Sequence, residues 1–431
     1  MPEFATRAIG LLGRGIGPEV DGIYEHWDHL RHLTPPDGLS PHDWWLAIKL
    51  ARWSAARCLS LDDKAGRAFT VALTDSMYRK LHFLDKEAGG TIQIDRAVND
   101  PTAQRYLLRS LMEEAMTSSQ MEGAATTSQV AKEMLATGRP PSDRSERMIA
   151  NNYSMMQSLR NFRNEPLTVA KLLEMHRILT HDTLEDPGEV GRFRTEADDI
   201  VVRDAHNPAV TLHVPPAAAE LGARLDALCA FANASDNEAF LHPVVRAIAI
   251  HFQVGYDHPF SDGNGRTARA LFYWSMLRSG YWLAEYLSIS AVLNKSRAEY
   301  VRAFLYTESD ESDMTYFVTH QLDVLLAAIE GLRGYLGRKS EERKQVELLL
   351  KPDSKLGAQV NYRQRALLLD AVRNGASAYA IGRHQAKHGV TYATARADLL
   401  KLVELKLLTQ HRRGKGFVFV PVRRLAARLG V

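Results

Sequence analysis

The stretch "HPFSDGNGRTAR", residues 258–269, gathers a histidine, an acid, two glycines and two arginines into one short segment. Its "DGNG" (262–265) predicts a sharp turn, and glycines there let backbone N–H groups approach a ligand closely. The residues that follow predict a helix, whose free N–H groups and positive dipole end favour an anion such as phosphate. The segment therefore predicts a phosphate-binding loop that opens a helix.

The side chains of this loop suit chemistry at a phosphate. Asp262 offers the hard oxygen ligand that Mg²⁺ prefers, and Arg266 and Arg269 share one helix face, where two guanidinium groups can hold two phosphates. His258 titrates near neutrality and can act as a base, while Phe260 is expected to anchor the loop in the core. Any one of these could be an ordinary loop residue, but the ordered set argues against that reading.

Outside the loop, apolar residues recur at three- and four-residue spacing, which predicts a mainly α-helical fold. The clearest of these runs are 43–59, 105–116, 244–256, 268–281 and 314–336. Alternating β-branched residues around "HNP" predict a hairpin at about 192–214. The charged, proline-broken stretch 337–356 is interpreted as a connector.

The composition is that of a soluble globular protein of two or three domains, with 431 residues, 45% hydrophobic and 24% charged. No apolar run reaches the roughly 18 residues that a membrane helix needs, and the first residues carry no signal-peptide pattern. Two cysteines, Cys58 and Cys229, cannot build a disulfide framework or a cysteine-based zinc site. We therefore expect a cytoplasmic protein with no membrane contact.

The C-terminal part differs in charge from the rest. Residues 360–431 hold 14 Lys and Arg against 3 Asp and Glu, a local charge of +11, so the remaining chain carries −8. Three predicted helices followed by a basic hairpin give the order of a winged helix. This part is expected to contact DNA through 391–415, where Thr391, Tyr392, Thr394 and Arg396 begin a helix and Arg412, Arg413 and Lys415 form the hairpin tip. Winged helices also dock proteins or form dimers, and that alternative stays open.

The segment 258–269 matches the H-x-F-x-[D/E]-G-N-G-R-x-x-R motif and so resembles the Fic family, over roughly residues 100–330. The resemblance implies Mg-ATP as co-substrate and transfer of AMP to a Ser, Thr or Tyr hydroxyl of a protein target. It makes His258 the general base, Asp262 the Mg²⁺ ligand and Phe260 the anchor. The phosphate-binding residues it implies are Gly263, Asn264, Gly265, Arg266 and Arg269. Doc kinases, which are related, have lysine where this chain has Gly265.

Further features follow from the same resemblance. The hairpin at 192–214 resembles the Fic flap, which docks a target peptide by strand addition. "SSQMEG" (118–123) resembles the inhibitory motif through Ser118, Glu122 and Gly123. A carboxylate paired with Arg269 would occupy the arginine that should hold the γ-phosphate. Glu122 could instead be a solvated surface acid, or could position water for the removal of AMP.

The sequence thus indicates four parts, with an N-terminal helical region (1–100) like that of longer bacterial Fic proteins. A Fic domain with its inhibitory helix (101–336), a linker (337–359) and a winged helix-turn-helix domain (360–431) follow. We expect an autoinhibited protein adenylyltransferase. Removal of AMP by the same site and a nucleotide-sensing DNA-binding regulator are the alternatives. The base of the nucleotide is left open, and homodimers are frequent in the family.

Overall fold

The computed structural model describes residues 2–89, 101–204, 207–235, 240–351, 353–354, 356–374, 378–413, 416–422 and 425–429. The chain forms two compact units, one of residues 1–92 with 107–329 and the other of residues 93–106 with 330–431. Both are mainly helical with short antiparallel strand pairs, as the sequence predicted. Among the described residues, no helix is long and apolar enough to cross a bilayer.

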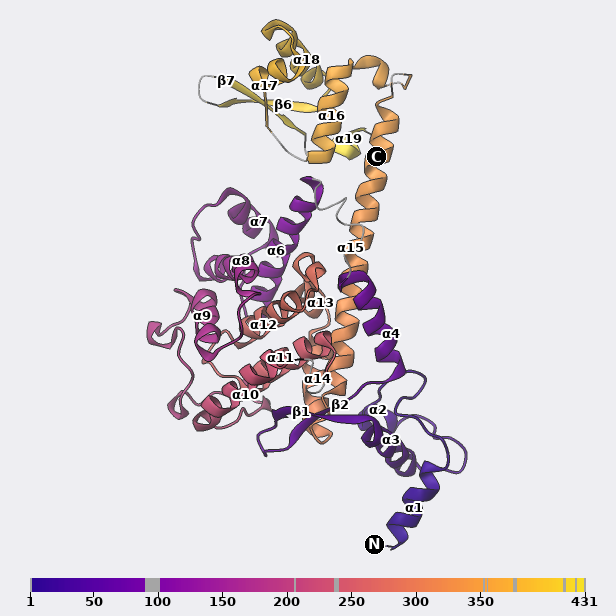
Figure 1. The fold of residues 1–431 in the computed structure, drawn as a ribbon. Coiled ribbons are helices and arrows are strands. Elements are labelled where there is room, and N and C mark those ends of the chain that lie inside the picture. Colours follow the sequence, from indigo (N-terminus) through magenta and orange to yellow (C-terminus); the bar gives the residue numbers. More distant parts are fainter. Residues whose placement is uncertain are drawn as a thin grey trace. The chain divides into compact units, whose positions relative to one another are not determined.

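Two buried helices form the centre of the first unit, α11 (Pro243–Asp257) and α12 (Asn264–Arg278). Figure 1 shows them side by side, joined by the loop that carries the motif. Apolar side chains surround α11, so it is a core helix and not a surface one. Pro243 suits the first turn of α11, because proline lacks the N–H that would be left unpaired there. The motif loop is therefore held between two rigid elements.

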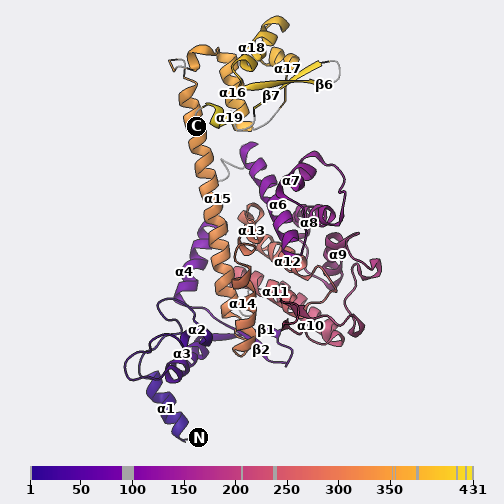
Figure 2. The same ribbon diagram turned by 180° about the vertical axis from the view of Figure 1, so that it is seen from behind.

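Other helices pack around this pair, as the view from behind shows (Figure 2). They are α8 (Arg144–Phe162), α9 (Val169–Thr180), α10 (Leu221–Asn233), α13 (Ile289–Leu293) and α14 (Arg297–Ser309). Two helices that precede α8 in the chain, α6 (Pro101–Met121) and α7 (Ser128–Thr137), pack against it through a small apolar cluster. That cluster contains Ala115, Met116, Ala131, Met134 and Ile149. It fixes the C-terminal part of α6.

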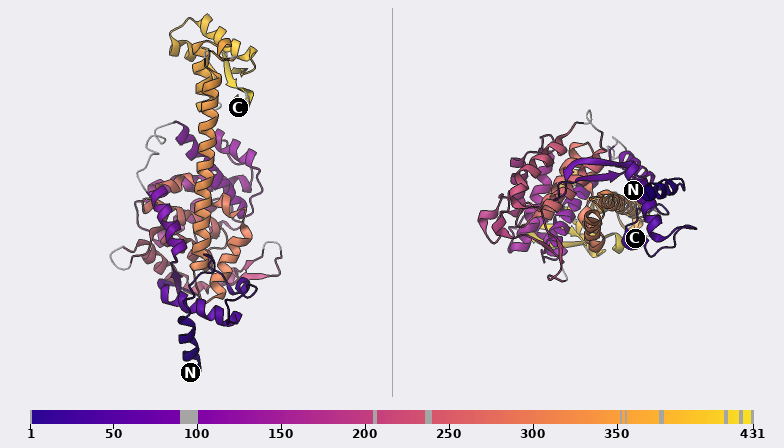
Figure 3. Two further views of the ribbon diagram at one scale, coloured as in Figure 1. Left: turned by 90° about the vertical axis from the view of Figure 1, so that its right-hand side faces the viewer. Right: turned by 90° about the horizontal axis from the view of Figure 1, so that it is seen from below.

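The N-terminal region is not purely helical, which corrects the expectation for residues 1–100. Its helices are α1 (Pro2–Leu12), α2 (Trp27–Leu30), α3 (Pro41–Ala55) and α4 (Asp75–Leu84), the last continued by a π-helical turn, η1 (Asp85–Gly89). The helix predicted over 43–59 ends at Ala55. Strands β1 (Ala56–Asp62) and β2 (Ala68–Ala72) then form an antiparallel pair, visible from below in Figure 3. Leu59 and Leu61 are buried in β1, and this two-residue spacing marks a strand.

The hairpin predicted at 192–214 is present but short. It consists of β3 (Val202–Arg203) and β4 (Thr211–His213), paired antiparallel. The preceding residues form a 3-10 turn, Glu196–Asp198, because the Asp198 side chain accepts from the Thr195 N–H in a capping box. Ala205 and His206, at the hairpin tip, lie outside the described residues.

The stretch expected to be a connector at 337–356 is helical over most of its length. Helix α15 (Thr315–Leu349) runs past the predicted end at residue 336. The charged residues between 337 and 349 are Glu, Lys and Arg, which are good helix formers. High charge alone therefore does not distinguish a connector from a helix.

The second unit contains the expected three helices and hairpin. They are α16 (Tyr362–Asn374), α17 (Ile381–His388), α18 (Tyr392–Glu404), β6 (Leu408–Arg413) and β7 (Gly416–Pro421). A short strand, β5 (Tyr379–Ala380), completes a sheet of order β5-β7-β6, and α19 (Leu425–Leu429) follows. Gly375, the predicted cap of α16, lies outside the described residues.

A buried carboxylate links the three helices of this unit. Asp398 of α18 accepts from Arg363 at 2.6 Å and from Asn361 at 2.6 Å, and His384 of α17 lies 3.2 Å away. Thr391 caps α18 by accepting from the Thr394 N–H, as predicted. These contacts and an apolar core around Leu399 and Phe419 fix how the helices pack.

Candidate active site

A stacked pair of rings holds the motif loop in place. Phe260 is fully buried, and its ring lies 3.7 Å from the ring of His176 at an angle of 4°. The Nδ1 atom of His176 accepts from the Gly191 N–H at 3.0 Å, and its Nε2–H donates to the Asp262 carbonyl at 3.0 Å. Burial lowers the pKa of His176 to about 4, so the ring is neutral in this single tautomer. His176 therefore ties the motif loop to the start of the hairpin segment.

The start of α12 is shaped for an anion. The Asn264 side chain closes the loop onto itself, accepting from the Phe260 N–H at 2.9 Å and donating to the Phe260 carbonyl at 2.8 Å. Gly263 has φ of 84°, and a Cβ there would lie 2.8 Å from Thr180 Cγ2. No side chain caps α12, so its first N–H groups stay available to a ligand.

Arg266 is buried with unused hydrogen-bonding capacity. It is 1% exposed and donates to the Leu179 carbonyl at 2.9 Å, while its other Nη atom lies 3.5 Å from Asp262. Its Nε has no partner among the described residues. A buried guanidinium with an unpaired donor fits a site that is completed by an anionic ligand.

Arg269 is held by residues of the α6 helix. Its Nε donates to Ser118 Oγ at 2.8 Å, and one Nη donates to the Ser118 carbonyl at 3.0 Å and to Glu122 Oε1 at 2.9 Å. Burial raises the pKa of Glu122, but the Arg269 charge and hydrogen bond outweigh it and leave this pKa below its usual value. The structure thus contains an ion pair between Glu122 and Arg269, as expected if residues 118–123 form an inhibitory motif.

Two glycines make room for this ion pair. A Cβ on Gly265 would lie 2.1 Å from Glu122 Oε1, so the carboxylate can reach Arg269 only over a residue without a side chain. Gly123 has φ of 93°, which lets the chain turn away directly after Glu122.

His258 has the geometry of a base. It caps the C-terminus of α11 in the left-handed region, with φ of 45°. Its Nδ1 lies 2.9 Å from the Gly255 carbonyl, which can only accept, so Nδ1 carries the proton and Nε2 keeps its lone pair. Arg194 fixes the backbone by donating to the His258 carbonyl at 2.8 Å. Burial lowers the pKa of His258, which keeps the ring neutral and ready to accept a proton.

Asp262 is the one motif residue suited to a metal. Its carboxylate is 35% exposed, accepts from the Gly263 N–H and lies 3.3 Å from an Arg144 Nη. The described residues contain no cluster of three His, Cys, Asp or Glu that could enclose an ion. One accessible carboxylate next to the anion-binding N–H groups of α12 fits Mg²⁺, because this ion keeps several waters and takes further ligands from substrate phosphates.

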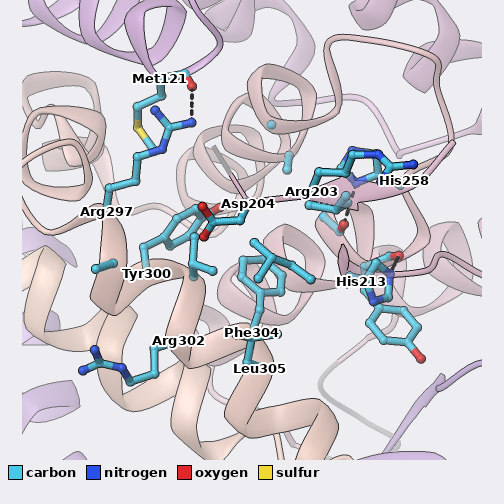
Figure 4. A pocket seen from close by; sticks show the side chains of 18 of the residues that line it. Met121, Arg203, Asp204, His213, His258, Arg297, Tyr300, Arg302, Phe304 and Leu305 are labelled. Atoms are coloured by element: carbon cyan, nitrogen blue, oxygen red, sulfur yellow. Dashed lines mark hydrogen bonds between the residues drawn. The ribbon is translucent and has the colours of Figure 1, made fainter. Parts of the chain in front are cut away.

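A cavity of about 430 Å³ opens beside these groups. Its walls come from the hairpin, α11, α12, α14 and the end of α6, and Figure 4 shows Phe304, Leu305 and Tyr300 of α14 facing it. Glu122, His258, Gly265 and Arg269 lie along its lining. A flat, partly apolar group could therefore bind next to the phosphate-binding loop.

The structure brings together every site residue predicted from the sequence. Glu122 and Ser118 meet Arg269 across 147 and 151 positions of the chain. Sequence reasoning missed Arg144, Arg194 and Tyr300. These residues lie in ordinary helical or loop sequence, so no local pattern marks them.

Comparison with known proteins agrees with the motif. Residues 166–276 match the model of the Fic/DOC family. This match contains the motif loop, the hairpin and His176, but it begins after Glu122. Over 234 residues, 53% of this chain, it is 28% identical to the protein adenylyltransferase Fic of Drosophila yakuba and covers 41% of that protein. Over 120 residues, 28% of this chain, it is 36% identical to the protein of the same name from Nematostella vectensis and covers 25% of it. The chain thus spans less than half the length of these relatives.

Solved structures share the fold. A Fic family protein from Desulfovibrio desulfuricans superposes with a TM-score of 0.53 and 17% identity, covering 81% of this chain and 97% of that one. Fic-1 of C. elegans gives a TM-score of 0.51 and 20% identity, covering 70% of this chain and 79% of that one. Residues 166–276 thus match the Fic/DOC family, and the chain shares its fold with solved Fic proteins.

Proposed function

We propose that this protein is an adenylyltransferase that moves AMP from Mg-ATP to a hydroxyl group of a protein target. The observation that carries the proposal is His258, whose free Nε2 lies on the same cavity wall as Gly265 and Arg269 of the phosphate-binding helix. The names of the Drosophila and Nematostella relatives support the same activity.

Each residue has one task in this reaction. The N–H groups at the start of α12, with Arg266 and Arg269, hold the phosphates of ATP. His258 Nε2 takes the proton of the target hydroxyl as its oxygen bonds to the α-phosphorus, and the bond to pyrophosphate breaks. Mg²⁺ on Asp262 would neutralise charge on the phosphates. The α14 side of the cavity would receive the base.

Glu122 would restrain this reaction, as in Fic proteins with an N-terminal inhibitory motif. Because its carboxylate already occupies Arg269, the γ-phosphate cannot use that arginine without displacing it. The same carboxylate could orient water toward an AMP-modified residue, so removal of AMP is the alternative. Wild-type protein that strips AMP from a modified target, with no transfer by any variant, would favour the alternative.

A target would dock on the hairpin at 192–214. The β3–β4 pair is short, and Val210 and Val214 beside it are 45% and 50% exposed. An exposed strand with apolar side chains can accept an extended peptide by backbone pairing.

The proposal is tested with ATP labelled in the α or the γ position, Mg²⁺ and a cell lysate. Transfer of the α label alone would support adenylylation, and transfer of the γ label would support a kinase instead. The same assay with labelled UTP decides the base, and omission of Mg²⁺ should abolish transfer.

The depressed pKa of His258 sets the pH range of transfer. Its largest cause is burial, which disfavours the imidazolium form, so the base stays deprotonated as the pH falls through 6.5. Glu122 raises this pKa, so its removal lowers the pKa further. We expect the midpoint of the pH–rate profile for transfer by the Glu122→Gly variant to lie below 6.5. A pH–rate profile with its midpoint at or above 6.5 would contradict this.

We propose DNA binding as a second function, carried by a winged helix-turn-helix domain at 360–431. In the proposed division of the chain, this domain follows a Fic domain at 101–336 and a linker at 337–359. The supporting observation is the face of α18 opposite its core. Tyr392 is 55% exposed and Arg396, one turn on, is also exposed, whereas Ala395 and Leu399 are buried. Arg412 of β6 is also exposed. Gly414 and Lys415 lie outside the described residues.

Fluorescence anisotropy with a labelled duplex tests this second function. We expect Arg396→Ala to weaken binding by about tenfold and to reduce its dependence on salt, because one phosphate contact is lost. Lys401→Ala, at the other end of α18, is the matched control. Absence of duplex binding at low salt would favour a protein-docking role.

Two further properties belong to the proposal. The unpaired Cys58 and Cys229 suggest a cytoplasmic location, and we propose that the protein forms a homodimer.

A further inference from the structure

The first turn of α14 contacts the end of α6. An Nη atom of Arg297 donates to the Met121 carbonyl at 2.8 Å, the contact drawn as a dashed line in Figure 4. Met121 is the last residue of α6 and directly precedes Glu122. A cation is favourable at the C-terminus of a helix, where carbonyl groups lack partners within the helix.

The same turn also contacts the partner of Glu122. Tyr300 lies three residues after Arg297, so the two side chains share one face of α14. The Tyr300 hydroxyl lies 2.9 Å from His251 Nε2 and interacts electrostatically with Arg269. One helical turn therefore reaches both halves of the Glu122–Arg269 ion pair.

The chain at Glu122 is otherwise held by backbone hydrogen bonds of the last turn of α6. The N–H groups of Glu122 and Ala124 donate to the Ser119 carbonyl, that of Gly123 donates to the Gln120 carbonyl, and Gly123 then turns the chain away. Ser118 holds Arg269 one helical turn earlier. The Arg297 bond is attached at the residue next to Glu122 and comes from a separate helix, so it limits how far the carboxylate can move from Arg269.

We propose that Arg297 is a positioning residue that keeps Glu122 on Arg269, so that the first turn of α14 sets the strength of the inhibition. This inference rests on the proposed function, because it concerns the regulation of the same site. Arg297 also lines the cavity. A ligand that enters the cavity therefore meets the guanidinium that restrains α6.

The test compares Arg297→Ala in two backgrounds. In the otherwise wild-type chain, loss of one partly exposed hydrogen bond should raise AMP transfer by about twofold to tenfold. In the Glu122→Gly background the same change should alter the rate by a smaller factor, because no carboxylate remains to be positioned and only the contact of Arg297 with a ligand in the cavity is lost. Lys295→Ala, an exposed residue just before α14, is the matched control and should leave both rates unchanged.

Two kinetic results would overturn the inference. One is an unchanged rate in the otherwise wild-type chain, and the other is an equal change in both backgrounds, which would mean that Arg297 acts on the nucleotide or the target. Hydrogen exchange provides a readout that does not need activity: Arg297→Ala should speed exchange of the Glu122 and Gly123 amides, and unchanged exchange would overturn the inference. If Glu122→Gly transfers no label, the proposed function fails, while the exchange measurement still decides the role of Arg297.

Discussion

Replacement of Glu122 by glycine is expected to raise AMP transfer on the order of tenfold to a hundredfold, the usual range for coupling between two sites. The change removes the carboxylate that occupies Arg269 at 2.9 Å, which frees the guanidinium for the γ-phosphate. Glycine costs little structure there, because α6 ends at Met121. The measurement is the initial rate of α-label transfer to protein at saturating Mg-ATP.

A second substitution separates charge from shape at this position. Glu122→Gln keeps the length of the side chain and can still accept from Arg269, but it lacks the charge that makes such a bond strong. We expect its rate to lie between those of wild type and Glu122→Gly. Equal rates for all three proteins would show that Glu122 does not restrain the reaction.

Loss of His258 is expected to have the largest effect of all. His258→Ala in the Glu122→Gly background should lower the rate by about 10²- to 10⁴-fold, the range associated with a general base. Because His258 has φ of 45°, alanine also strains the backbone. His258→Asn is therefore the better variant, since asparagine tolerates this conformation and supplies no base.

Nucleotide binding provides the control for this prediction. The phosphate-binding groups belong to α12 and not to His258, so ATP affinity measured by calorimetry should stay within a few-fold of the parent. A variant that transfers AMP at the parental rate would remove His258 from the mechanism. Loss of transfer together with loss of ATP binding would show a structural role instead.

The sequence predicted those parts of the site that are contiguous. His258 to Arg269 form one loop and one helical turn, so the spacing alone gives their relative placement. Glu122 was found because a short motif preceded the same core. Arg297 and Tyr300 could not be found in this way, because their role depends on how α14 packs against α6 and α11, and helical periodicity does not specify which helices become neighbours.

The errors in the fold have equally local causes. Residues 43–59 carry helical spacing throughout, but the pairing of β1 with β2 ends the helix at Ala55, and this pairing depends on residues 68–72, which follow the periodic run. The charged stretch 337–356 was interpreted as a connector, although its charge is equally compatible with a long helix, which continues to Leu349. The hairpin was predicted correctly in position but too long, since the cap at Asp198 forms a turn from residues that looked extended.

The uncapped start of α12 has a consequence for work with the purified protein. In most helices a serine or aspartate satisfies the first N–H groups, whereas here Gly263 leaves them open. These groups do not distinguish ATP from inorganic anions, so phosphate or sulfate in a buffer competes for the same place. The apparent nucleotide affinity therefore depends on the buffer anion, and a chloride-based buffer gives the value closest to the intrinsic one.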